Sequence, residues 1–507
     1  MTDTEDGYTR LQRGGLVLGP FLFVVVRLFV SPAGLSPAAN AVLAGTLWIA
    51  AWWMTEAVPI PVTSLLPILL FPTLGVATVV ETAAPYADPV VFLFLGGFLV
   101  ALAIERWNLH RRIALGVLLR VGDDTRRLLL GFMLVTAFLS MWVSNTATAM
   151  MMVPIGMAVV AQVDAFRASG ESAEPAAPDF ELSPEPLAAG ETELPRSNFG
   201  TALMLGIAYA ASVGGVATII GTPPNAILAG IAQSTLGVRI GFVQWMVFAL
   251  PIAVVFLGVT WVVLITLLRP EVRTVPESHA VVKSQLEALG PMTRGERRVV
   301  AVFALVVSGW LLRPFVIEPV APGVTDTTVA LVGGILVFLV PVDLKRGEFL
   351  LEWEATTRVP WGVLLLFGAG FSLARLFQLS GLDRWIAGNL VALRGVEFVW
   401  VVLAVATLVV FLTEVTSNSA TASLFIPVMA SLGASLAVSP IVLMVTVSVA
   451  ASLAFMLPVA TPPNAIVFGS GYVSIPQMAR VGFWLNLLGI LFLTLMASLW
   501  FPIAWNL

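Results

Sequence analysis

Two short motifs place serine and asparagine in otherwise apolar stretches of this 507-residue chain, SNTATAMMMVP at 144–154 and SNSATASLFIP at 417–427. Two more, GTPPN at 221–225 and ATPPN at 460–464, put paired prolines inside apolar runs. Proline lacks an N–H donor and clashes with the preceding helical turn, so we expect a helix to unwind at each pair. The freed carbonyls and the hydroxyl and amide oxygens are ligands for a small cation, and helix N-termini attract anions.

The polar motifs are almost free of charged side chains. Segments 140–156, 212–232 and 455–470 contain no Lys, Arg, Asp, Glu or His. An anion bound there has no basic partner, so bound cations must offset its charge. Proton coupling needs a titratable group in the site. Glu414 is the one candidate and its counterpart is Met141, so we favour Na⁺ and expect Glu414 to be a hydrogen-bonded hairpin residue rather than a proton carrier.

The composition identifies the class of protein. Hydrophobic residues make up 58% of the chain and charged residues 11%, against about 25% charge in soluble proteins. We therefore predict an integral membrane protein and exclude a soluble enzyme. The net charge of −4 gives no basic excess for a nucleic-acid partner. With no cysteine and two histidines, His110 and His279, a membrane-embedded enzyme lacks its nucleophile and metal ligands.

Long apolar runs predict the spans, because a helix needs about 20 residues to cross a bilayer. The regions 128–162 and 398–436 are too long for one span and have polar centres, so we interpret each as a re-entrant hairpin. The predicted fold is an all-α polytopic membrane protein with eleven transmembrane helices and two such hairpins. The helices are expected at 15–31, 38–55, 58–75, 88–105, 200–233, 242–268, 298–317, 326–342, 361–379, 441–470 and 481–504.

The distribution of basic residues predicts the orientation. With the N-terminus in the cytoplasm, twenty Lys and Arg fall on the inside and four on the outside. This bias follows the positive-inside rule and predicts a multi-pass protein of the cell membrane with an extracellular C-terminus. The basic, amphipathic stretch 105–127 is expected to form an interfacial helix on the cytoplasmic face.

The two halves of the chain resemble each other. Ser144 and Ser417 are 273 residues apart, as are Phe98 and Phe371. The paired-proline motifs are 239 residues apart, because the first half carries an extra acidic loop at about 163–196. The predicted topology inserts the two hairpins from opposite sides. We therefore expect an inverted repeat, a recurring plan of secondary transporters.

At these motifs, and at TEAVPIPVTSLLP (55–67), the chain resembles the divalent-anion:sodium symporter family, whose members carry dicarboxylates, citrate or sulfate. The resemblance implies a homodimer, with a scaffold domain and a transport domain that moves in an elevator-type cycle. It assigns 1–127 to scaffold spans and an arm helix, 128–241 to the first hairpin and broken span (transport), 242–397 mostly to scaffold, and 398–507 to the second transport half.

The resemblance also implies the site residues. Two departures from the family pattern matter, because Ser419 replaces a threonine at a ligand-contacting position and Thr413 stands where serine is common. The serine at 419 leaves the choice of substrate open. The threonine at 413 keeps the hydroxyl group that an ion site needs. The first Na⁺ site resembles Ser140, Ser144, Asn145 and the backbone of Gly221; the second resembles Thr413, Ser417, Asn418 and the backbone of Ala460; the substrate would meet Asn145, Thr146, Thr222, Pro223, Asn418, Ser419, Thr461 and Pro462.

We therefore expect a sodium-coupled symporter of divalent organic anions, with a C4-dicarboxylate such as succinate, malate or fumarate as substrate and at least two Na⁺ sites. Sulfate, citrate or dicarboxylate exchange on the same machinery remains an alternative. A Na⁺/H⁺ antiporter or an oxyanion exporter is a further alternative. It should place carboxylates in the unwound segments, which carry none.

Overall fold

The computed structural model describes residues 8–30, 32–169, 197–271, 274, 278–389, 395–436 and 438–505. The regular secondary structure is almost entirely helical, in agreement with the predicted all-α class. The helices are α1 (Arg10–Phe29), α2 (Pro37–Thr55), α3 (Ile60–Thr63), α4 (Leu66–Thr73), α5 (Val79–Ala83), α6 (Pro89–Arg106), α7 (Leu109–Leu118), α8 (Thr125–Ser140), α9 (Asn145–Ser169), α10 (Asn198–Val216), α11 (Pro223–Leu236), α12 (Phe242–Leu267), α13 (Ser278–Ala288), α14 (Arg294–Leu312), α15 (Asp326–Leu339), α16 (Trp361–Ser380), α17 (Leu382–Asn389), α18 (Phe398–Thr413), α19 (Asn418–Leu436), α20 (Pro440–Ala450), α21 (Pro462–Gly469) and α22 (Ile475–Trp505).

Both predicted hairpins are present as helix pairs. The first is α8 followed by α9, and the second is α18 followed by α19, and each pair is in contact. The turns between the helices are short, and the Ser-Asn motif lies at the turn in both pairs. The polar centre of each long apolar region is therefore the point where the chain reverses, as the sequence indicates.

Both paired-proline motifs interrupt a helix. Between α10 and α11 the break leads to Pro223, and between α20 and α21 it leads to Pro462. Each of these prolines occupies the first position of the following helix, where its missing N–H is not needed. The preceding helices have already ended, at Val216 and Ala450, and the prolines start the next ones, so the predicted unwinding is confirmed just before each pair.

Two predicted elements differ from the structure. The expected span 58–75 is two short helices, α3 and α4, with Pro61 and Pro67 each in the first turn of its own helix. The expected interfacial helix 105–127 is reduced to α7, because α6 continues to Arg106 and the chain turns again before α8.

The structure also contains two short strands and several long apolar helices. Strands β1 (Pro341–Asp343) and β2 (Glu348–Phe349), which the sequence did not predict, form a small antiparallel pair after α15. Nine helical segments within the described ranges are long and apolar enough to cross a membrane. The expected acidic loop lies mostly outside the described residues.

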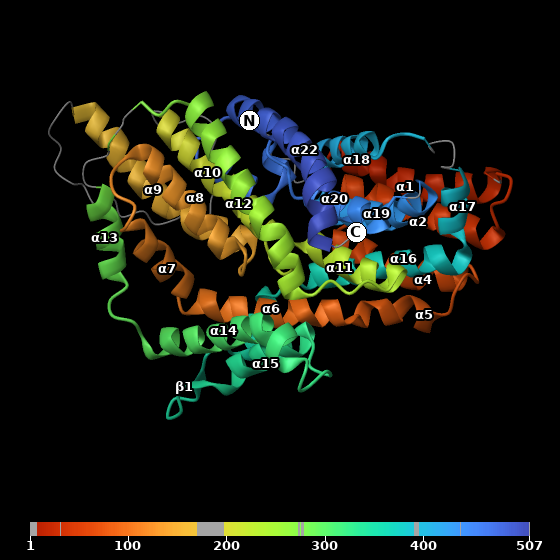
Figure 1. The fold of residues 1–507 in the computed structure, drawn as a ribbon, viewed down its shortest axis with the longest axis horizontal. Coiled ribbons are helices and arrows are strands. Elements are labelled where there is room, and N and C mark those ends of the chain that lie inside the picture. Colours follow the sequence, from red (N-terminus) through yellow and green to blue (C-terminus); the bar gives the residue numbers. More distant parts are fainter. Residues whose placement is uncertain are drawn as a thin grey trace.

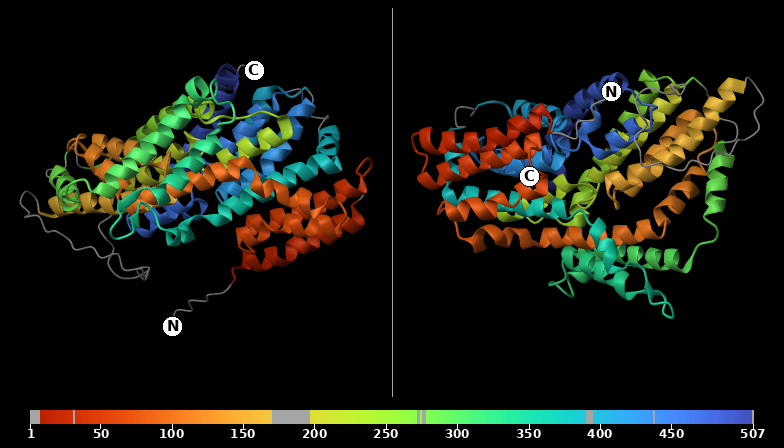
Figure 2. Two further views of the ribbon diagram at one scale, coloured as in Figure 1. Left: turned by 90° about the horizontal axis from the view of Figure 1, so that it is seen from below. Right: turned by 180° about the vertical axis from the view of Figure 1, so that it is seen from behind.

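The helices fall into groups that Figure 1 separates. Helices α8, α9 and α10 gather at one end, α1, α2 and α16 to α19 at the other, and α6, α14 and α15 line one long side. The view from behind in Figure 2 shows the same grouping. Helix α10 lies at the centre of its group, with every residue from Phe199 to Val216 buried.

The two halves interlock at their breaks. Helix α11, which follows the first break, packs on α19 of the second hairpin, and α21, which follows the second break, packs on α9 of the first. Helix α12 packs on α10 and α22. Because α10 packs on α8 and α22 packs on α18, these contacts connect α12 to both hairpins, although α12 begins the segment 242–397 that the resemblance assigns mostly to scaffold.

Candidate functional site

The first hairpin brings a cluster of oxygen atoms together at its turn. Ser140 ends α8, is fully buried, and donates from Oγ to the carbonyl oxygen of Ala211 at 2.7 Å. The amide of Asn145, the first residue of α9, contacts Ser140 Oγ. One terminal atom of this amide lies 3.1 Å from the Ala211 carbonyl oxygen and 3.3 Å from that of Gly221.

The two orientations of the Asn145 amide have different consequences. With nitrogen at that terminal position, the amide donates to the carbonyls of Ala211 and Gly221. With oxygen there, three unprotonated oxygens and the Ser140 hydroxyl converge, and a cation stabilises such a set. Without an ion the orientation with nitrogen there satisfies the amide and the carbonyls, whereas the orientation with oxygen there supplies the oxygen ligands of a cation site.

The second hairpin repeats this arrangement. Thr413 is fully buried and ends α18, and its Oγ1, with one proton to donate, lies 2.6 Å from Asn418 Oδ1 and 3.1 Å from the Ala451 carbonyl oxygen. Thr413 and Asn418 are each 273 residues from Ser140 and Asn145, the offset found in the sequence. Two clusters built from a hydroxyl, an amide and the carbonyl of a broken helix therefore occur in equivalent places.

The last residue of each proline motif shapes the break in front of it. Asn225 is fully buried, and its Nδ2 lies 3.3, 3.2 and 2.8 Å from the carbonyl oxygens of Gly215, Val216 and Thr218. Asn464, also fully buried, repeats two of these bonds at the same offset of 239, to the carbonyls of Ala454 at 3.2 Å and Leu457 at 3.0 Å. Each break therefore has a defined shape and is not a loose loop.

Four helices begin in the Ser-Asn and paired-proline motifs. Helices α9 and α19 start directly after Ser144 and Ser417, and the Ser144 Oγ accepts from the Ala147 N–H at 3.2 Å. Helices α11 and α21 start after Thr222 and Thr461, which share one extended backbone conformation, with φ of −145° and −144°. The positive end of a helix dipole stabilises an anion without a basic side chain.

The expected site residues fall into two sets. The structure brings Ser140, Asn145 and the Gly221 carbonyl together, and it brings Thr413 and Asn418 together. The remaining expected residues lie at the starts of the same helices, with Ser144 and Pro462 exposed, Thr146, Pro223, Ser417 and Ser419 half-buried, and Thr222, Thr461 and Ala460 buried.

Several groups at the clusters and breaks were not predicted from the sequence. The Ala211 and Ala451 carbonyls occupy places that the resemblance gave to no residue. Asn225 and Asn464 could have been found, because both stand at the same position of the repeated proline motif. A backbone carbonyl has no such signal, since any residue type supplies it.

Glu414 is held by hydrogen bonds, as expected. Its carboxylate is buried and accepts from the backbone N–H groups of Phe455 (2.7 Å), Met456 (3.0 Å) and Leu457 (3.1 Å), and from Asn486 Nδ2 (2.7 Å). The acceptor thereby fixes the backbone of the second break. Asn486 on α22 was not predicted, because it is a single amide in an apolar helix.

The first half makes the equivalent connection without a charge. Met141 takes the place of Glu414, and its backbone carbonyl accepts from Thr218 Oγ1 at 2.6 Å. Thr218 and Leu457 are 239 residues apart, so each hairpin turn binds its own broken helix at the same point. No group of three or more His, Asp or Glu side chains in the described residues is placed to hold a metal ion. Any cation at these clusters therefore depends on neutral oxygens.

Comparison with known proteins agrees with this chemistry. The family model for the sodium:sulfate symporter transmembrane region matches residues 14–506. A sodium-dependent dicarboxylate transporter, SdcS of Staphylococcus saprophyticus, is 42% identical over 492 residues, which cover 96% of this chain and 91% of that protein. SdcS of Staphylococcus aureus strain USA300 is 41% identical over 494 residues, covering 97% and 91%.

A solved structure shares the fold. The crystal structure of the YdaH transporter of Alcanivorax borkumensis matches with a TM-score of 0.58 at 15% sequence identity. The match covers 91% of this chain and 99% of that one. At this identity the likeness concerns the arrangement of helices alone.

Proposed function

The chain belongs to the sodium:sulfate symporter family, and from this premise we propose that it is a sodium-coupled symporter of dicarboxylates, with a C4-dicarboxylate such as succinate as the preferred substrate. The observation that carries the proposal is the pair of equivalent, uncharged oxygen clusters at the two hairpin turns. The names of the SdcS relatives, sodium-dependent dicarboxylate transporters, support both the ion and the substrate class.

Electrostatics explains why the ion and the substrate travel together. A dianion in a buried site without a basic partner is strongly disfavoured. Two Na⁺ ions beside it neutralise its charge, and the substrate in turn reduces the repulsion between them. Each therefore binds better with the others present, so neither crosses efficiently alone.

We assign the two Na⁺ sites to the two clusters. The first takes Ser140, Asn145 and the carbonyls of Ala211 and Gly221, and the second takes Thr413, Asn418 and the Ala451 carbonyl, with Ser144, Ser417 and the Ala460 backbone as the remaining expected ligands. The substrate carboxylates would lie at the four helix N-termini. Their proposed contacts are Asn145, Thr146, Thr222, Pro223, Asn418, Ser419, Thr461 and Pro462.

The movement that we propose is an elevator-type displacement of the hairpin helices against a scaffold. The packing of α12 on α10 and α22 supports placing α12 in the moving part, and the intimate packing of α6 on α15 supports placing both in the scaffold. The resemblance supports a homodimer. The excess of basic residues on one side supports a cytoplasmic N-terminus, an extracellular C-terminus and a place in the cell membrane.

Uptake into proteoliposomes tests the proposal. Labelled succinate should accumulate when Na⁺ is outside and should not when choline replaces it. Unlabelled malate and fumarate should compete, whereas sulfate and citrate should compete weakly. Stronger competition by sulfate or citrate would change the substrate, exchange without net Na⁺-driven uptake would change the mode, and uptake independent of Na⁺ would contradict the proposal.

A further inference from the structure

Two buried hydroxyl groups connect the halves of the protein at the breaks. Ser448 on α20 donates from Oγ to Asn225 Oδ1 in the first half at 3.2 Å. Tyr209 on α10 donates from Oη to the Phe455 carbonyl oxygen in the second half at 2.8 Å. Both donors are fully buried. Each hydroxyl therefore bonds to a group of the other half. Ser448 bonds to the side chain that holds the first break, and Tyr209 bonds to a carbonyl of the second break.

These links are reciprocal. Tyr209 and Ser448 are 239 residues apart, which is the offset of the two paired-proline motifs. Other buried hydroxyls of the same helix stay within it: Thr446 Oγ1, for example, donates to the Val442 carbonyl of α20 itself at 2.8 Å. Thr201 of α10 also donates to the second half, to the Tyr472 carbonyl oxygen at 2.9 Å, but that acceptor lies after α21. Tyr209 and Ser448 differ from it because their acceptors belong to the breaks or hold them.

Each link ends next to a proposed Na⁺ cluster. Asn225, the acceptor of Ser448, also holds the carbonyls that define the first break, the segment leading to Gly221. Ser448 itself lies three residues before Ala451, whose carbonyl accepts from Thr413 in the second cluster. A displacement of the first break is therefore passed to the helix end that forms the second cluster.

The Tyr209 link also connects one proposed Na⁺ cluster to the break of the other half. Tyr209 lies two residues before Ala211, whose carbonyl belongs to the first cluster. Its acceptor, the carbonyl of Phe455, lies in the segment that Glu414 and Asn464 hold. The Tyr209 and Phe455 rings also pack edge to face with centroids 5.0 Å apart, so both the side chain and its acceptor are fixed.

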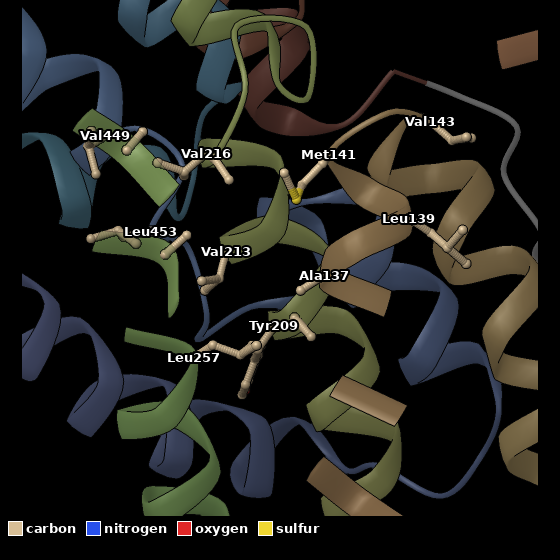
Figure 3. Close-up of a cluster of buried hydrophobic side chains, with 14 of the residues drawn as sticks. Ala137, Leu139, Met141, Val143, Tyr209, Val213, Val216, Leu257, Val449 and Leu453 are labelled. Carbon is tan, nitrogen blue, oxygen red and sulfur yellow. The ribbon is translucent and has the colours of Figure 1, made fainter. Parts of the chain in front are cut away.

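Between the links the two halves meet through apolar side chains. Figure 3 shows Val213 and Val216 of α10 beside Val449 and Leu453 of the second half, with Tyr209 further along α10 near Leu257. A cavity of about 10 Å³ among them has an apolar lining. A water molecule needs polar partners, and this cavity offers none between the two links. The Tyr209 and Ser448 hydroxyls are the buried polar connections that reach the two breaks.

We propose that Tyr209 and Ser448 are positioning residues that couple the two Na⁺ sites, so that an ion at one break favours binding at the other. This inference rests on the proposed function, because it takes the two clusters as Na⁺ sites. Coupling between two sites is reciprocal, and typical couplings change affinity about 5- to 150-fold. Removing both links should make the sites independent.

Equilibrium Na⁺ titration of the purified full-length protein, without substrate, tests the coupling. Of the fifteen tryptophans, Trp245 contacts the first break, because its Nε1 donates to the Val216 carbonyl at 3.0 Å, and a parallel titration of Trp245→Phe isolates its signal. Tryptophan fluorescence should follow Na⁺ with a Hill coefficient above one in the native protein. In the Tyr209→Phe, Ser448→Ala double variant the coefficient should fall to about one, and half-saturation should rise about fivefold.

Matched variants separate coupling from folding. Ser448→Thr keeps a hydroxyl and should retain cooperativity, and Thr446→Ala removes a buried hydroxyl that makes no link and should leave it unchanged. Removing the second site by Asn418→Ala should weaken Na⁺ binding at the first break in the native background and should have no such effect in the double variant. If Tyr209→Phe does not fold, the Ser448→Ala single variant tests the coupling, with Ser448→Thr and Thr446→Ala as its controls.

The outcomes distinguish this inference from the proposed function. A native Hill coefficient of one or less, or undiminished cooperativity in the double variant, overturns the coupling while Na⁺-dependent succinate uptake still supports the symporter. A native protein that shows neither a Na⁺-dependent fluorescence change nor Na⁺-dependent uptake overturns both.

Discussion

Asn145 and Asn418 begin the second helices of the two hairpins, and each amide meets the hydroxyl group of the residue five positions earlier. Both side chains are half-buried, and each shares its hydroxyl partner with a backbone carbonyl of a broken helix. The two amides are therefore the common element of two clusters that are far apart in the sequence.

Replacing either asparagine by alanine should abolish Na⁺-dependent succinate uptake. The substitution removes an oxygen ligand and leaves buried hydroxyl and carbonyl groups without their partner, a cost of about 1–3 kcal/mol per group. Uptake in proteoliposomes at saturating Na⁺ should fall at least tenfold for Asn145→Ala and for Asn418→Ala. Asn389→Ala, an exposed amide that bonds within α17, should transport normally; native-like uptake in either site variant would refute the assignment.

The polar motifs and the helix breaks were predictable because their causes are local. Single prolines such as Pro154, Pro251 and Pro427 lie inside helices, but the paired prolines each start a new one, and both they and the Ser-Asn pairs are visible without tertiary information. The repeated offset then predicted that the motifs act as pairs. Hydropathy alone was sufficient for the hairpins, since each apolar region was too long for one crossing.

The partners of these motifs were not predictable because tertiary packing selects them. The carbonyls of Ala211 and Ala451 differ from other carbonyls by their position alone, and the Tyr209 and Ser448 links exist because two helices from different halves lie together. The length of α7 was misjudged for a related reason. Its charge pattern continued beyond Leu118, where the chain turns.

Glu414→Gln should weaken Na⁺-dependent uptake, chiefly at low Na⁺. The carboxylate accepts bonds from three successive backbone N–H groups and Asn486. A glutamine offers one acceptor oxygen, and its NH₂ group faces donors. We expect a loss of about 1–3 kcal/mol in stability and a severalfold rise in the Na⁺ concentration for half-maximal uptake, measured by thermal unfolding in detergent and by transport.

A comparison of pH dependence separates this structural role from proton transfer. Glu397→Gln is the matched control, because Glu397 is exposed at the start of α18 and should tolerate the change. If Glu414 carried the coupled proton, the glutamine variant would lose any acceleration of uptake by an inward proton gradient. Na⁺-driven uptake that persists without such a change would agree with the backbone-holding role.

Asp326→Ala should destabilise the contact between α15 and α12. Asp326 Oδ1 pairs with Arg313 Nε at 2.5 Å, and its Oδ2 accepts from the Phe242 N–H at 2.9 Å. Phe242 in turn stacks on Trp310, with centroids 4.5 Å apart. Because both charged side chains are largely shielded, we expect a loss of about 1–3 kcal/mol, seen as a lower unfolding temperature.

The matched change is Glu318→Gln, since Glu318 also pairs with Arg313, at 2.8 Å, but its side chain is 46% exposed. A more exposed pair contributes about 0–1 kcal/mol. The loss of stability should therefore be clearly smaller than for Asp326→Ala. Equal losses from the two variants would show that the bond to Phe242 contributes nothing.

A disulfide between α6 and the first break should stop transport if the break moves against the scaffold. A Cβ placed on Gly97 lies 3.9 Å from the Cβ of Ile220, within the separation that a disulfide spans. The chain contains no cysteine, so Gly97→Cys with Ile220→Cys introduces the one available pair. Oxidation should reduce succinate uptake at least tenfold, and a reductant should restore it.

The control pair joins two helices of the proposed scaffold. A Cβ on Gly309 of α14 lies 3.8 Å from the Cβ of Val329 on α15. Gly309→Cys with Val329→Cys should therefore cross-link equally well, while uptake stays the same under oxidising and reducing conditions. Complete cross-linking of the Gly97 and Ile220 positions with undiminished uptake would mean that the first break keeps its place beside α6 through the cycle. The elevator-type displacement would then have to be abandoned.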